Sequence, residues 1–259
     1  MSTAVHASAI VSLLARLGER VEIGPYAVIG PEVELGDGTT VGAHATIEGP
    51  AVFGEANRVF AHAVIGFEPQ DLKYRGEKTS VRIGNRNVFR EFSTIHRGTA
   101  TGHGETVIGD NNYFMAGCHV AHDCRFGSNS ILAQSAGLAG HVEVGDRVMI
   151  GAFVGAHQFV RIGNHAFVGA YAQIRQDVLP FCKTDGIVAK TYGINRIGLQ
   201  RLGFSEDRLK ALERAYRLLV KSKLNTTQAL PKIEEELSGQ PDVEYLVRFI
   251  RESKRGFHR

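Results

Sequence analysis

An apolar residue recurs at every sixth position through most of this chain. Counting by six, the series runs without a polar residue from Val5 to Ile65, resumes from Ile83 to Ile95 and, after a slip of one residue, continues from Ile108 to Ile174. A helix of 3.6 residues per turn loses this phase, and an ordinary hairpin sandwich does not keep it either. The period therefore indicates many short structural units stacked on one another.

The residue after each periodic position is often glycine, as at Gly24, Gly30 and Gly36. This pattern predicts a parallel β-helix, in which short strands turn at glycine-bearing corners and the apolar residues stack inward as columns. Three sides of one hexad each make a coil of about 18 residues, and successive coils stack at ~4.8 Å. Residues three hexads apart in the sequence are therefore expected to be direct neighbours in space.

The hexad pattern ends near residue 180, and helical spacing replaces it. Ser205 is suited to be an N-cap, because acidic residues follow in the next turn and apolar residues recur at helical spacing beyond them. Two further helices are expected, at residues 226–238 and from Pro241 to about Arg255. The sequence predicts a mainly β chain, with a β-helix domain at residues 1–180 and an α-helical domain at residues 181–259.

Two polar segments, residues 67–80 and residues 99–106, interrupt the hexads. Ile83 lies three whole hexads after Ile65, so the first segment is expected to replace part of one coil without disturbing the register. The second segment accounts for the slip in phase. Loops on a rigid scaffold often carry function, and a plain solvated loop is the alternative for each segment.

Charge and composition add a basic tail to this picture. Residues 201–259 contain 13 Lys and Arg against 9 Asp and Glu, so this segment carries the whole excess of the chain's net charge of +3. A basic helical surface suits an acidic partner, and an ordinary soluble surface is the alternative. Nucleic acid is not expected as a partner, because basic and aromatic residues are not interleaved in a binding motif.

The sequence also favours a cytoplasmic protein. It has no apolar run long enough for an integral membrane segment, and His6 and Ser8 interrupt any signal-peptide pattern at the start. Cys118 and Cys124 both occupy the small fifth position of a hexad, and no C-x-x-C spacing occurs. We therefore expect them to be packing residues in a reducing compartment.

The spacing rule gathers polar residues around the stretch from Gly117 to Cys124. His122 should lie beside Gly140 and Gln158 in the next two coils, and Asp123 should align with His141 in the same way. A cluster of titratable groups outside the apolar columns is typical of a functional site, although solvated surface residues are the alternative.

Several motifs spread over nearly the whole chain carry a resemblance to a known family. They are Gln70–Tyr74, Thr94–Gly98, His119–Cys124, Leu138–His141, His157–Phe159 and Gly198–Phe204. Together they are similar to the UDP-N-acetylglucosamine O-acyltransferases, which catalyse the first step of lipid A biosynthesis. The resemblance implies a left-handed parallel β-helix with a C-terminal α-helical domain, assembled as a homotrimer with its sites between subunits.

The implied reaction moves a (3R)-hydroxyacyl group from the thioester of acyl carrier protein to the 3-position of UDP-N-acetylglucosamine. Such a transfer needs a base for the sugar hydroxyl and a fixed donor for the oxyanion. By resemblance, His122 is the general base, Asp123 assists its orientation and the backbone N–H of Gly140 is the oxyanion donor. No cofactor and no metal are implied.

The resemblance also assigns substrate-binding positions near the sugar nucleotide or the acyl chain. They are Gln70, Asp71, Lys73, His96, His119, His141, His157, Gln158, Asn195 and Arg201. Ile197 and Leu202 depart from the family pattern at positions associated with nucleotide binding. Ala170 and Val188 differ in the region that sets acyl length, so the preferred chain length stays open, as does the choice between a 3-hydroxyl and a 3-amino acceptor.

Three other interpretations compete with this one. The related N-acyltransferase of the same pathway carries an extra N-terminal domain, whereas here the repeat begins at Val5. A carbonic-anhydrase-like β-helix protein would use histidines such as His119 and His122 as zinc ligands. A purely structural β-helix would need neither clustered polar residues nor a basic tail.

Overall fold

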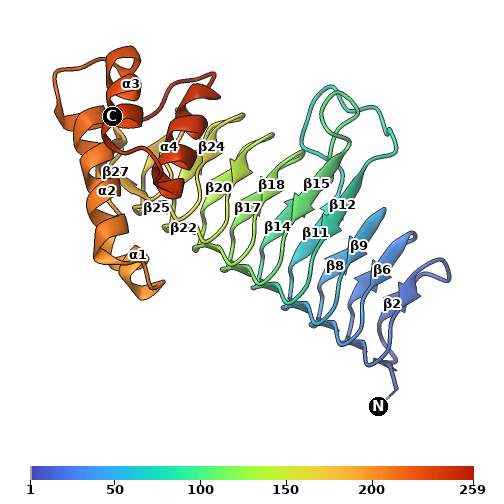
Figure 1. Cartoon of the computed structure of the whole chain (residues 1–259). Coiled ribbons are helices and arrows are strands. Elements are labelled where there is room, and N and C mark those ends of the chain that lie inside the picture. Colours follow the sequence, from blue (N-terminus) through green and yellow to red (C-terminus); the bar gives the residue numbers. More distant parts are fainter. Residues whose placement is uncertain (1) are drawn as a thin grey trace.

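The computed structural model of the chain describes residues 2–259, and its strands form three sheets that wrap around one core (Figure 1). Sheet A contains β1 (Ala4–Val5), β4 (Glu22–Ile23), β7 (Thr40–Val41), β10 (Arg58–Val59), β13 (Val88–Phe89), β16 (Tyr113–Phe114), β19 (Ile131–Leu132), β22 (Met149–Ile150), β25 (Phe167–Val168), β27 (Cys182–Asp185) and β28 (Lys190–Ile194). Sheet B contains β2 (Ile10–Val11), β5 (Val28–Ile29), β8 (Thr46–Ile47), β11 (Val64–Phe67), β14 (Thr94–His96), β17 (His119–Val120), β20 (Gly137–Leu138), β23 (Gly155–Ala156) and β26 (Gln173–Ile174). Sheet C contains β3 (Arg16–Leu17), β6 (Val33–Leu35), β9 (Ala51–Phe53), β12 (Ser80–Ile83), β15 (Glu105–Ile108), β18 (Arg125–Phe126), β21 (Glu143–Val144) and β24 (Arg161–Ile162).

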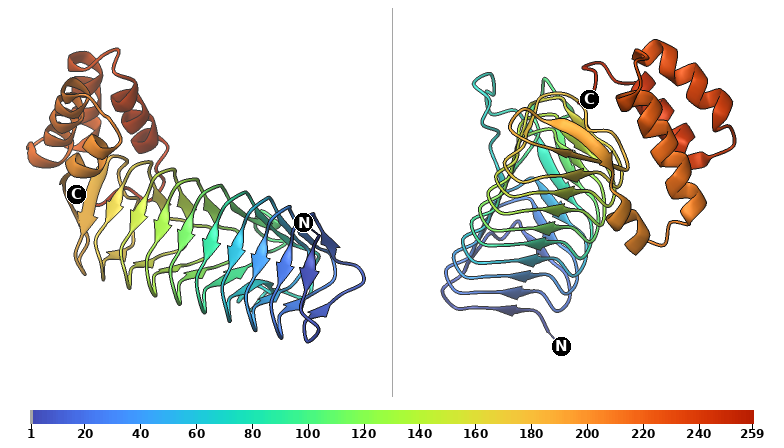
Figure 2. Two further views of the ribbon diagram at one scale, coloured as in Figure 1. Left: turned by 90° about the horizontal axis from the view of Figure 1, so that it is seen from below. Right: turned by 90° about the vertical axis from the view of Figure 1, so that its left-hand side faces the viewer.

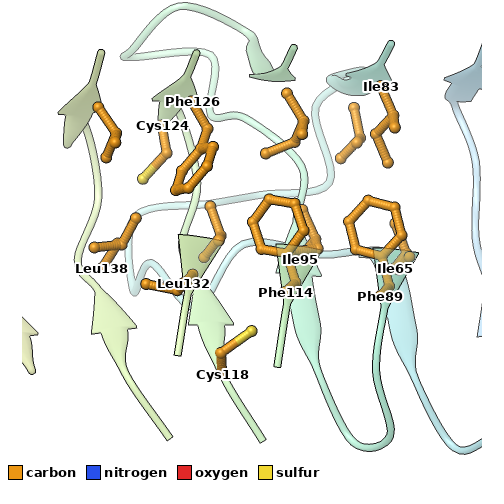
Figure 3. Packing of buried hydrophobic residues seen from close by; sticks show 14 of the residues in the cluster. Ile65, Ile83, Phe89, Ile95, Phe114, Cys118, Cys124, Phe126, Leu132 and Leu138 are labelled. Carbon is orange, nitrogen blue, oxygen red and sulfur yellow. The ribbon is translucent and has the colours of Figure 1, made fainter. Parts of the chain in front are cut away.

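The strands of the β-helix pair in parallel, and the three-hexad rule holds in its regular coils. Val120 of β17 pairs with Leu138 of β20, which lies three hexads later. The periodic residues are buried and stack in columns, and Figure 3 shows Phe89 beside Phe114, whose ring centroids are 4.9 Å apart. A single apolar core thus runs along the axis of the β-helix.

The cysteines belong to this core. Cys118 and Cys124 are buried and free, as is Cys182, and the first two point inward among the apolar columns (Figure 3). Burial raises the pKa of each thiol to about 12. The prediction that Cys118 and Cys124 are packing residues is confirmed.

The prediction for residues 67–80 was wrong. Ile83 does not stack on Ile65: it pairs with Phe53 of sheet C, whereas Ile65 pairs with Ile95. The partners in both pairs are five hexads apart, so this coil gains two hexads instead of losing part of a side. Because the insertion is a whole number of hexads, it leaves the phase unchanged, and counting in sixes shows the interruption but not the number of hexads in the coil.

The prediction for residues 99–106 is confirmed. Ile83 pairs with Ile108, which lies four hexads and one residue later. This coil therefore exceeds the regular three hexads by one hexad plus one residue, and the extra residue is the slip seen in the sequence. Figure 1 shows both insertions as loops that leave the β-helix on the same side.

The corners of the β-helix carry the periodic glycines, as predicted, but these glycines do not supply the left-handed residue of the turn. Most turns place a residue in the left-handed region, and most of these residues are not glycine; Tyr26 and His44, with φ of 56° and 57°, are examples. The periodic glycines serve close approach instead. A Cβ on Gly42 would lie 2.8 Å from the backbone nitrogen of Ala61 in the next coil.

A helical region follows the β-helix. It contains α1 (Arg196–Arg201), α2 (Glu206–Tyr216), a π-helical turn η1 (Arg217–Lys221), α3 (Thr226–Glu236) and α4 (Pro241–Arg251). Ser205 caps α2 as predicted, and its side chain accepts a hydrogen bond from the Arg208 N–H. The last two helices end earlier than predicted, and α1, η1 and the antiparallel pair β27 and β28 were not foreseen.

The helices pack around their own apolar cluster, which includes Leu199, Leu212, Leu219 and Ile250. Figure 2 shows them gathered at the C-terminal end of the β-helix, away from the N-terminus. None of the helices in residues 2–259 has the length and apolar character needed to cross a bilayer. A parallel β-helix followed by a helical region is the fold class that the sequence predicted, and it is confirmed.

Candidate active site

Asp123 lies at the corner between sheets B and C, shortly after β17, and its carboxylate is buried. The loop at residues 99–106 folds back over it and supplies donors: the Thr99 hydroxyl at 2.6 Å and the N–H groups of Thr99 and His103 at 3.1 Å and 2.8 Å. Gly102 makes this approach possible, because a Cβ there would lie 2.4 Å from the carboxylate carbon. The loop thus closes around a fixed anion.

These contacts keep Asp123 ionised. Burial by itself would raise the pKa of Asp123, but the hydrogen bonds from His122, Thr99 and His103 outweigh burial and hold that pKa below its usual range. The carboxylate is therefore negative at any pH near neutrality.

His122 is oriented by this carboxylate. Its Nδ1 lies 2.8 Å from Oδ2 of Asp123, and the side chain is 14% exposed. An ionised carboxylate only accepts hydrogen bonds, so in the neutral ring Nδ1 carries the proton and Nε2 has the lone pair. A histidine in this tautomer can take a proton from a ligand at Nε2.

Gly140 lies against the same imidazole, as the three-hexad rule predicts. A Cβ on Gly140 would lie 2.5 Å from Cε1 and 2.7 Å from Nε2 of His122, so only glycine leaves room for the ring. Among residues 2–259, no backbone carbonyl accepts the Gly140 N–H. This N–H is a free donor on a residue that adjoins the His122 ring.

His141 and Phe159 continue the corner in the next two coils. Their rings stack with centroids 4.4 Å apart, and the ring of His141 meets that of His122 edge-on at 5.2 Å. Burial lowers the pKa of His141. The predicted cluster of His122, Asp123, Gly140 and His141 is therefore present in the structure.

Two hollows meet at His122. The first, which we call the polar hollow, has a volume of ≈ 690 Å³ and brings the loop at residues 67–80 against the corner. It is lined by Gln70, Asp71, Leu72, Lys73, Thr101, His122, His141, Gln158 and Phe159.

The second, the small-residue hollow, has a volume of ≈ 400 Å³ and lies over sheet B. It is lined by Gln70, His96, His119, Ala121, His122, Gly137, Leu138, Ala139, Gly140, Gly155 and Ala156. His122 and Gln70 line both hollows. The imidazole of His122, which can accept a proton, therefore lies between a hollow suited to a polar ligand and one suited to an apolar chain.

His96 and His119 form one wall of the small-residue hollow. Their rings meet edge-on with centroids 5.2 Å apart, and Nδ1 of His119 lies 2.7 Å from the Thr94 hydroxyl. Burial lowers the pKa of His96 and lowers that of His119 to about 4. His119 is therefore neutral at pH 7 and contributes polarity without charge.

Three predicted substrate-binding residues, Asn195, Arg201 and His157, lie outside both hollows. The side chain of Asn195 caps α1 by accepting from the Gly198 N–H, and it donates to the His165 carbonyl at 3.1 Å. Arg201 is exposed at the end of the same helix. In Figures 1 and 2, α1 and the loop at residues 67–80 lie on different sides of the β-helix. His157 faces Arg255, whose Nη2 lies 3.3 Å from its Nδ1.

A metal ion could bind at this corner only if it displaced hydrogen bonds that Asp123 already accepts. Potential ligand atoms of His122, Asp123 and His141 lie within 4.8 Å of one another, and His119, which the zinc interpretation paired with His122, is not in this group. The carboxylate of Asp123 already accepts bonds from three residues. A cation there would have to displace some of them.

Thr99 and His103 were not identified as site residues from the sequence, because their bonds to Asp123 connect residues 24 and 20 positions apart. They lie in a non-periodic segment, and the spacing rule does not reach them. Only their position in an interruption of the repeat pointed to this loop.

Comparison with known proteins bears on the whole chain. A family profile described as "Udp N-acetylglucosamine O-acyltransferase; Domain 2" matches residues 177–258, and one described as "Bacterial transferase hexapeptide (six repeats)" matches residues 15–49 and 141–176. The acyl-[acyl-carrier-protein]–UDP-N-acetylglucosamine O-acyltransferase of Thermodesulfovibrio yellowstonii is 46% identical over 255 residues, which cover 98% of this chain and 99% of that protein. The chain belongs to the UDP-N-acetylglucosamine O-acyltransferase family.

Other members of the O-acyltransferase family agree in sequence and in structure. The protein of the same description from Halorhodospira halophila is 48% identical over 257 residues, 99% of this chain and 100% of its own. The crystal structure of Francisella novicida UDP-N-acetylglucosamine acyltransferase superposes with a TM-score of 0.96 at 38% identity, covering 98% of this chain and 94% of that one. The resemblance inferred from the motifs is confirmed.

Proposed function

We propose that this chain transfers a (3R)-hydroxyacyl group from acyl carrier protein to the 3-position of UDP-N-acetylglucosamine, the first step of lipid A biosynthesis. The observation that carries the proposal is the setting of His122. Its Nδ1 is bound to a buried carboxylate at 2.8 Å, and His122 lines both hollows. A base held in this way suits proton removal from a sugar hydroxyl.

His122, Gly140 and Asp123 have different roles in the proposed reaction. Nε2 of His122 takes the proton of the sugar hydroxyl as its oxygen attacks the thioester carbonyl. The carbonyl oxygen becomes an oxyanion, to which the free N–H of Gly140 donates. The intermediate then collapses, the C–S bond breaks and the leaving sulfur receives the proton from His122. Asp123 stabilises the imidazolium that exists between these steps.

The two hollows suit two different ligands. Asp71 and Lys73 give the polar hollow a carboxylate and an ammonium, which can bind sugar hydroxyls and phosphate. The small-residue hollow is floored by residues such as Gly137 and Gly155, where an added Cβ would meet nothing within 4 Å. An acyl chain fits over such a floor, so we place the sugar nucleotide in the first hollow and the acyl group in the second.

The positions of Asn195 and Arg201 support a homotrimer. Both were assigned to substrate binding by resemblance, yet α1 lies on a different side of the β-helix from the 67–80 loop. Within one chain, neither residue lines a hollow that contains His122. In a trimer, α1 of one subunit would reach the polar hollow of its neighbour, and each site would be completed between two subunits.

The helical region supports docking of the acyl carrier protein, an acidic partner. In the part of the chain that the structure describes, several arginines of this region are in ion pairs, whereas Lys210, Lys221 and Lys223 have none. Free cations on a surface steer an acidic protein, and this attraction is screened over ~8 Å at physiological salt. We also propose the cytoplasm as the site of action, where acyl carrier protein is loaded.

The test is an assay of purified protein with (3R)-hydroxyacyl-carrier proteins of several chain lengths and UDP-N-acetylglucosamine, read by mass spectrometry. The expected product is the 3-O-acylated sugar nucleotide, and the KM for the carrier protein should rise with salt more than the KM for the nucleotide. A second acceptor, 3-O-acylated UDP-glucosamine, is tested in parallel because it offers a free amine in place of the 3-hydroxyl. Transfer to that amine but not to UDP-N-acetylglucosamine would support the N-acyltransferase instead.

A further inference from the structure

The loop at residues 67–80 carries Gln70 and Lys73 but has almost no apolar contacts of its own. Within it only Pro69 and Thr79 are buried, and Leu72 is 96% exposed. Ordering a segment of this kind costs conformational entropy, which contacts with the β-helix must offset.

The tip of this loop is one hydrogen-bonded unit. The backbone N–H of Lys73 donates to Oδ1 of Asp71 at 2.9 Å, and the N–H of Tyr74 donates to the Asp71 carbonyl at 3.0 Å. The hydroxyl of Tyr74 donates to the Glu77 carbonyl at 2.8 Å. Whatever holds Tyr74 therefore also holds Asp71 and Lys73.

Arg97 holds Tyr74 to the β-helix. Its Nη2 donates to the Tyr74 hydroxyl oxygen at 3.0 Å, and its Nη1 donates to the carbonyls of Gly66 at 3.1 Å and Gly49 at 3.3 Å. Its backbone N–H donates to the Phe67 carbonyl at 3.1 Å, and the guanidinium carbon lies 5.7 Å from the centroid of the Tyr74 ring. One side chain, 13% exposed, thus connects the loop to two earlier coils.

The other charged links of the loop are weaker. Lys78 pairs with Glu32 at 2.7 Å, but their side chains are 75% and 53% exposed. Exposed ion pairs contribute little to order, because water screens them and two long side chains must be fixed. Glu68 also pairs at 3.6 Å, and its partner is again Arg97.

Arg97 also adjoins the site. The residue before it, His96, lines the small-residue hollow together with Gln70 of the loop. Strand β14 and its end therefore supply a wall of that hollow at His96 and, one residue later, the attachment of the loop that closes over it.

We propose that Arg97 positions the 67–80 loop against His122, so that capture of the sugar nucleotide depends on the contact between Arg97 and Tyr74. This inference rests on the proposed function for the identity of the ligand. Arg97 does not touch the reacting atoms and acts through the loop. Lysine cannot replace it, because a single ammonium lacks the rigid fork that reaches the Tyr74 hydroxyl and two carbonyls together.

The experiment uses the full-length protein with Arg97→Lys, Tyr74→Phe and the double variant. Each single change should raise the KM for UDP-N-acetylglucosamine about tenfold, because it removes a charge-assisted hydrogen bond that orders the loop. The kcat and the KM for the acyl-carrier protein should change little. The double variant should be no worse than Arg97→Lys alone, since both changes remove one shared contact.

A second measurement reads the loop without turnover. Limited digestion with trypsin should cut at Lys73 and Arg75 faster in both variants than in wild type. Arg82→Lys is the control, because Arg82 is an exposed arginine that pairs with Glu105 at 3.0 Å on the neighbouring strand and does not contact the loop. It should leave both the KM and the digestion unchanged.

The inference and the proposed function fail separately. Unchanged digestion of both variants would overturn the anchoring by Arg97 even if the wild-type protein proved inactive on UDP-N-acetylglucosamine. With an active wild type, an unchanged nucleotide KM in both variants, or a double variant whose effects simply add, would overturn it as well. A lower melting temperature with unchanged KM values would show a role in stability alone.

Discussion

Two corners of the β-helix share one backbone geometry and differ in chemistry. At the corner between sheets A and B, Tyr26, His44, His62 and Phe92 occupy the left-handed position and their rings stack at 5.0–5.1 Å. At the corner between sheets B and C, the same position is taken by Asp123, His141 and Phe159, with φ of 60°, 63° and 65°. The first column is an exposed stack of rings, which we call the ring ladder. The second column begins with the buried carboxylate of Asp123.

The difference lies in what covers each corner. No insertion covers the ring ladder, and Tyr26 and Phe92 are 60% and 62% exposed. The second corner is covered by residues 99–106, whose N–H groups and hydroxyl surround Asp123, and it faces the 67–80 loop. The repeat therefore supplies a rigid geometry, and the two interruptions of the repeat distinguish the corner that we propose as the active site.

The largest expected difference in kcat is between a variant that replaces the proposed base in the second corner and a matched variant in the first corner. His122→Ala is expected to lower kcat by ~10²–10⁴-fold or more, because the sugar hydroxyl loses its proton acceptor. The matched variant is His62→Ala in the ring ladder. Its kcat should stay within about twofold of the wild-type value. Steady-state kinetics on both purified proteins decides the matter, and near wild-type kcat in His122→Ala would remove this residue from the mechanism.

Gly140→Ala tests the space around the base. The new Cβ would lie 2.5 Å from the ring of His122, so the imidazole must shift, and a misplacement of about 1 Å can cost ~10²-fold in kcat. Gly42→Ala is the control at the corner between sheets A and B, where the new Cβ would lie 2.8 Å from the backbone nitrogen of Ala61. This variant should have a lower melting temperature, while the folded enzyme keeps its kcat. Equal losses of kcat in both would contradict a special role for Gly140.

Lys73→Ala tests the loop that faces the second corner. Loss of a charged contact to the ligand should raise the KM for the sugar nucleotide about tenfold. Lys78→Ala is the control on the same loop, because its partner is the exposed Glu32 and it does not line the polar hollow. Calorimetry should give weaker nucleotide binding for the first variant only, and unchanged affinity would place the acceptor elsewhere.

The buried histidines of the site should make stability depend on pH. In the folded chain burial holds the pKa of His119 at about 4, below the usual value of 6.5, so the unfolded chain binds more protons between these values. The free energy of unfolding should therefore fall as the pH drops from about 6.5 towards 4, by up to ~1.4 kcal/mol per pH unit for this residue. Asp123 stays ionised through that window, since hydrogen bonds outweigh burial and keep its pKa low.

Denaturant unfolding at pH 5 and pH 7 measures this slope. His119→Gln, which keeps a polar side chain without a titrating ring, should have a shallower dependence than wild type. An equal slope in both proteins would assign the effect to other groups, such as His96, whose pKa burial also lowers.

Much of the fold followed from the period alone. The stacking of Val120 on Leu138, the burial of the cysteines and the placing of Gly140 beside His122 all come from counting along the chain. The count failed at residues 67–80, because an insertion of two whole hexads keeps the phase and leaves Ile83 three hexads after Ile65, as in a regular coil. It also did not predict α1 or the pair β27 and β28, which lie outside the repeat.

The sequence by itself determined which residues of the repeat are neighbours, because stacked coils of constant length turn a spacing in sequence into a distance in space. Only the tertiary structure decided that Thr99 and His103 fold back onto Asp123, that Arg97 reaches Tyr74 and that α1 lies on another side of the β-helix from the 67–80 loop. These contacts depend on the path of non-periodic segments. A loop closes on whichever partners satisfy its polar groups, and no spacing rule lists those partners in advance.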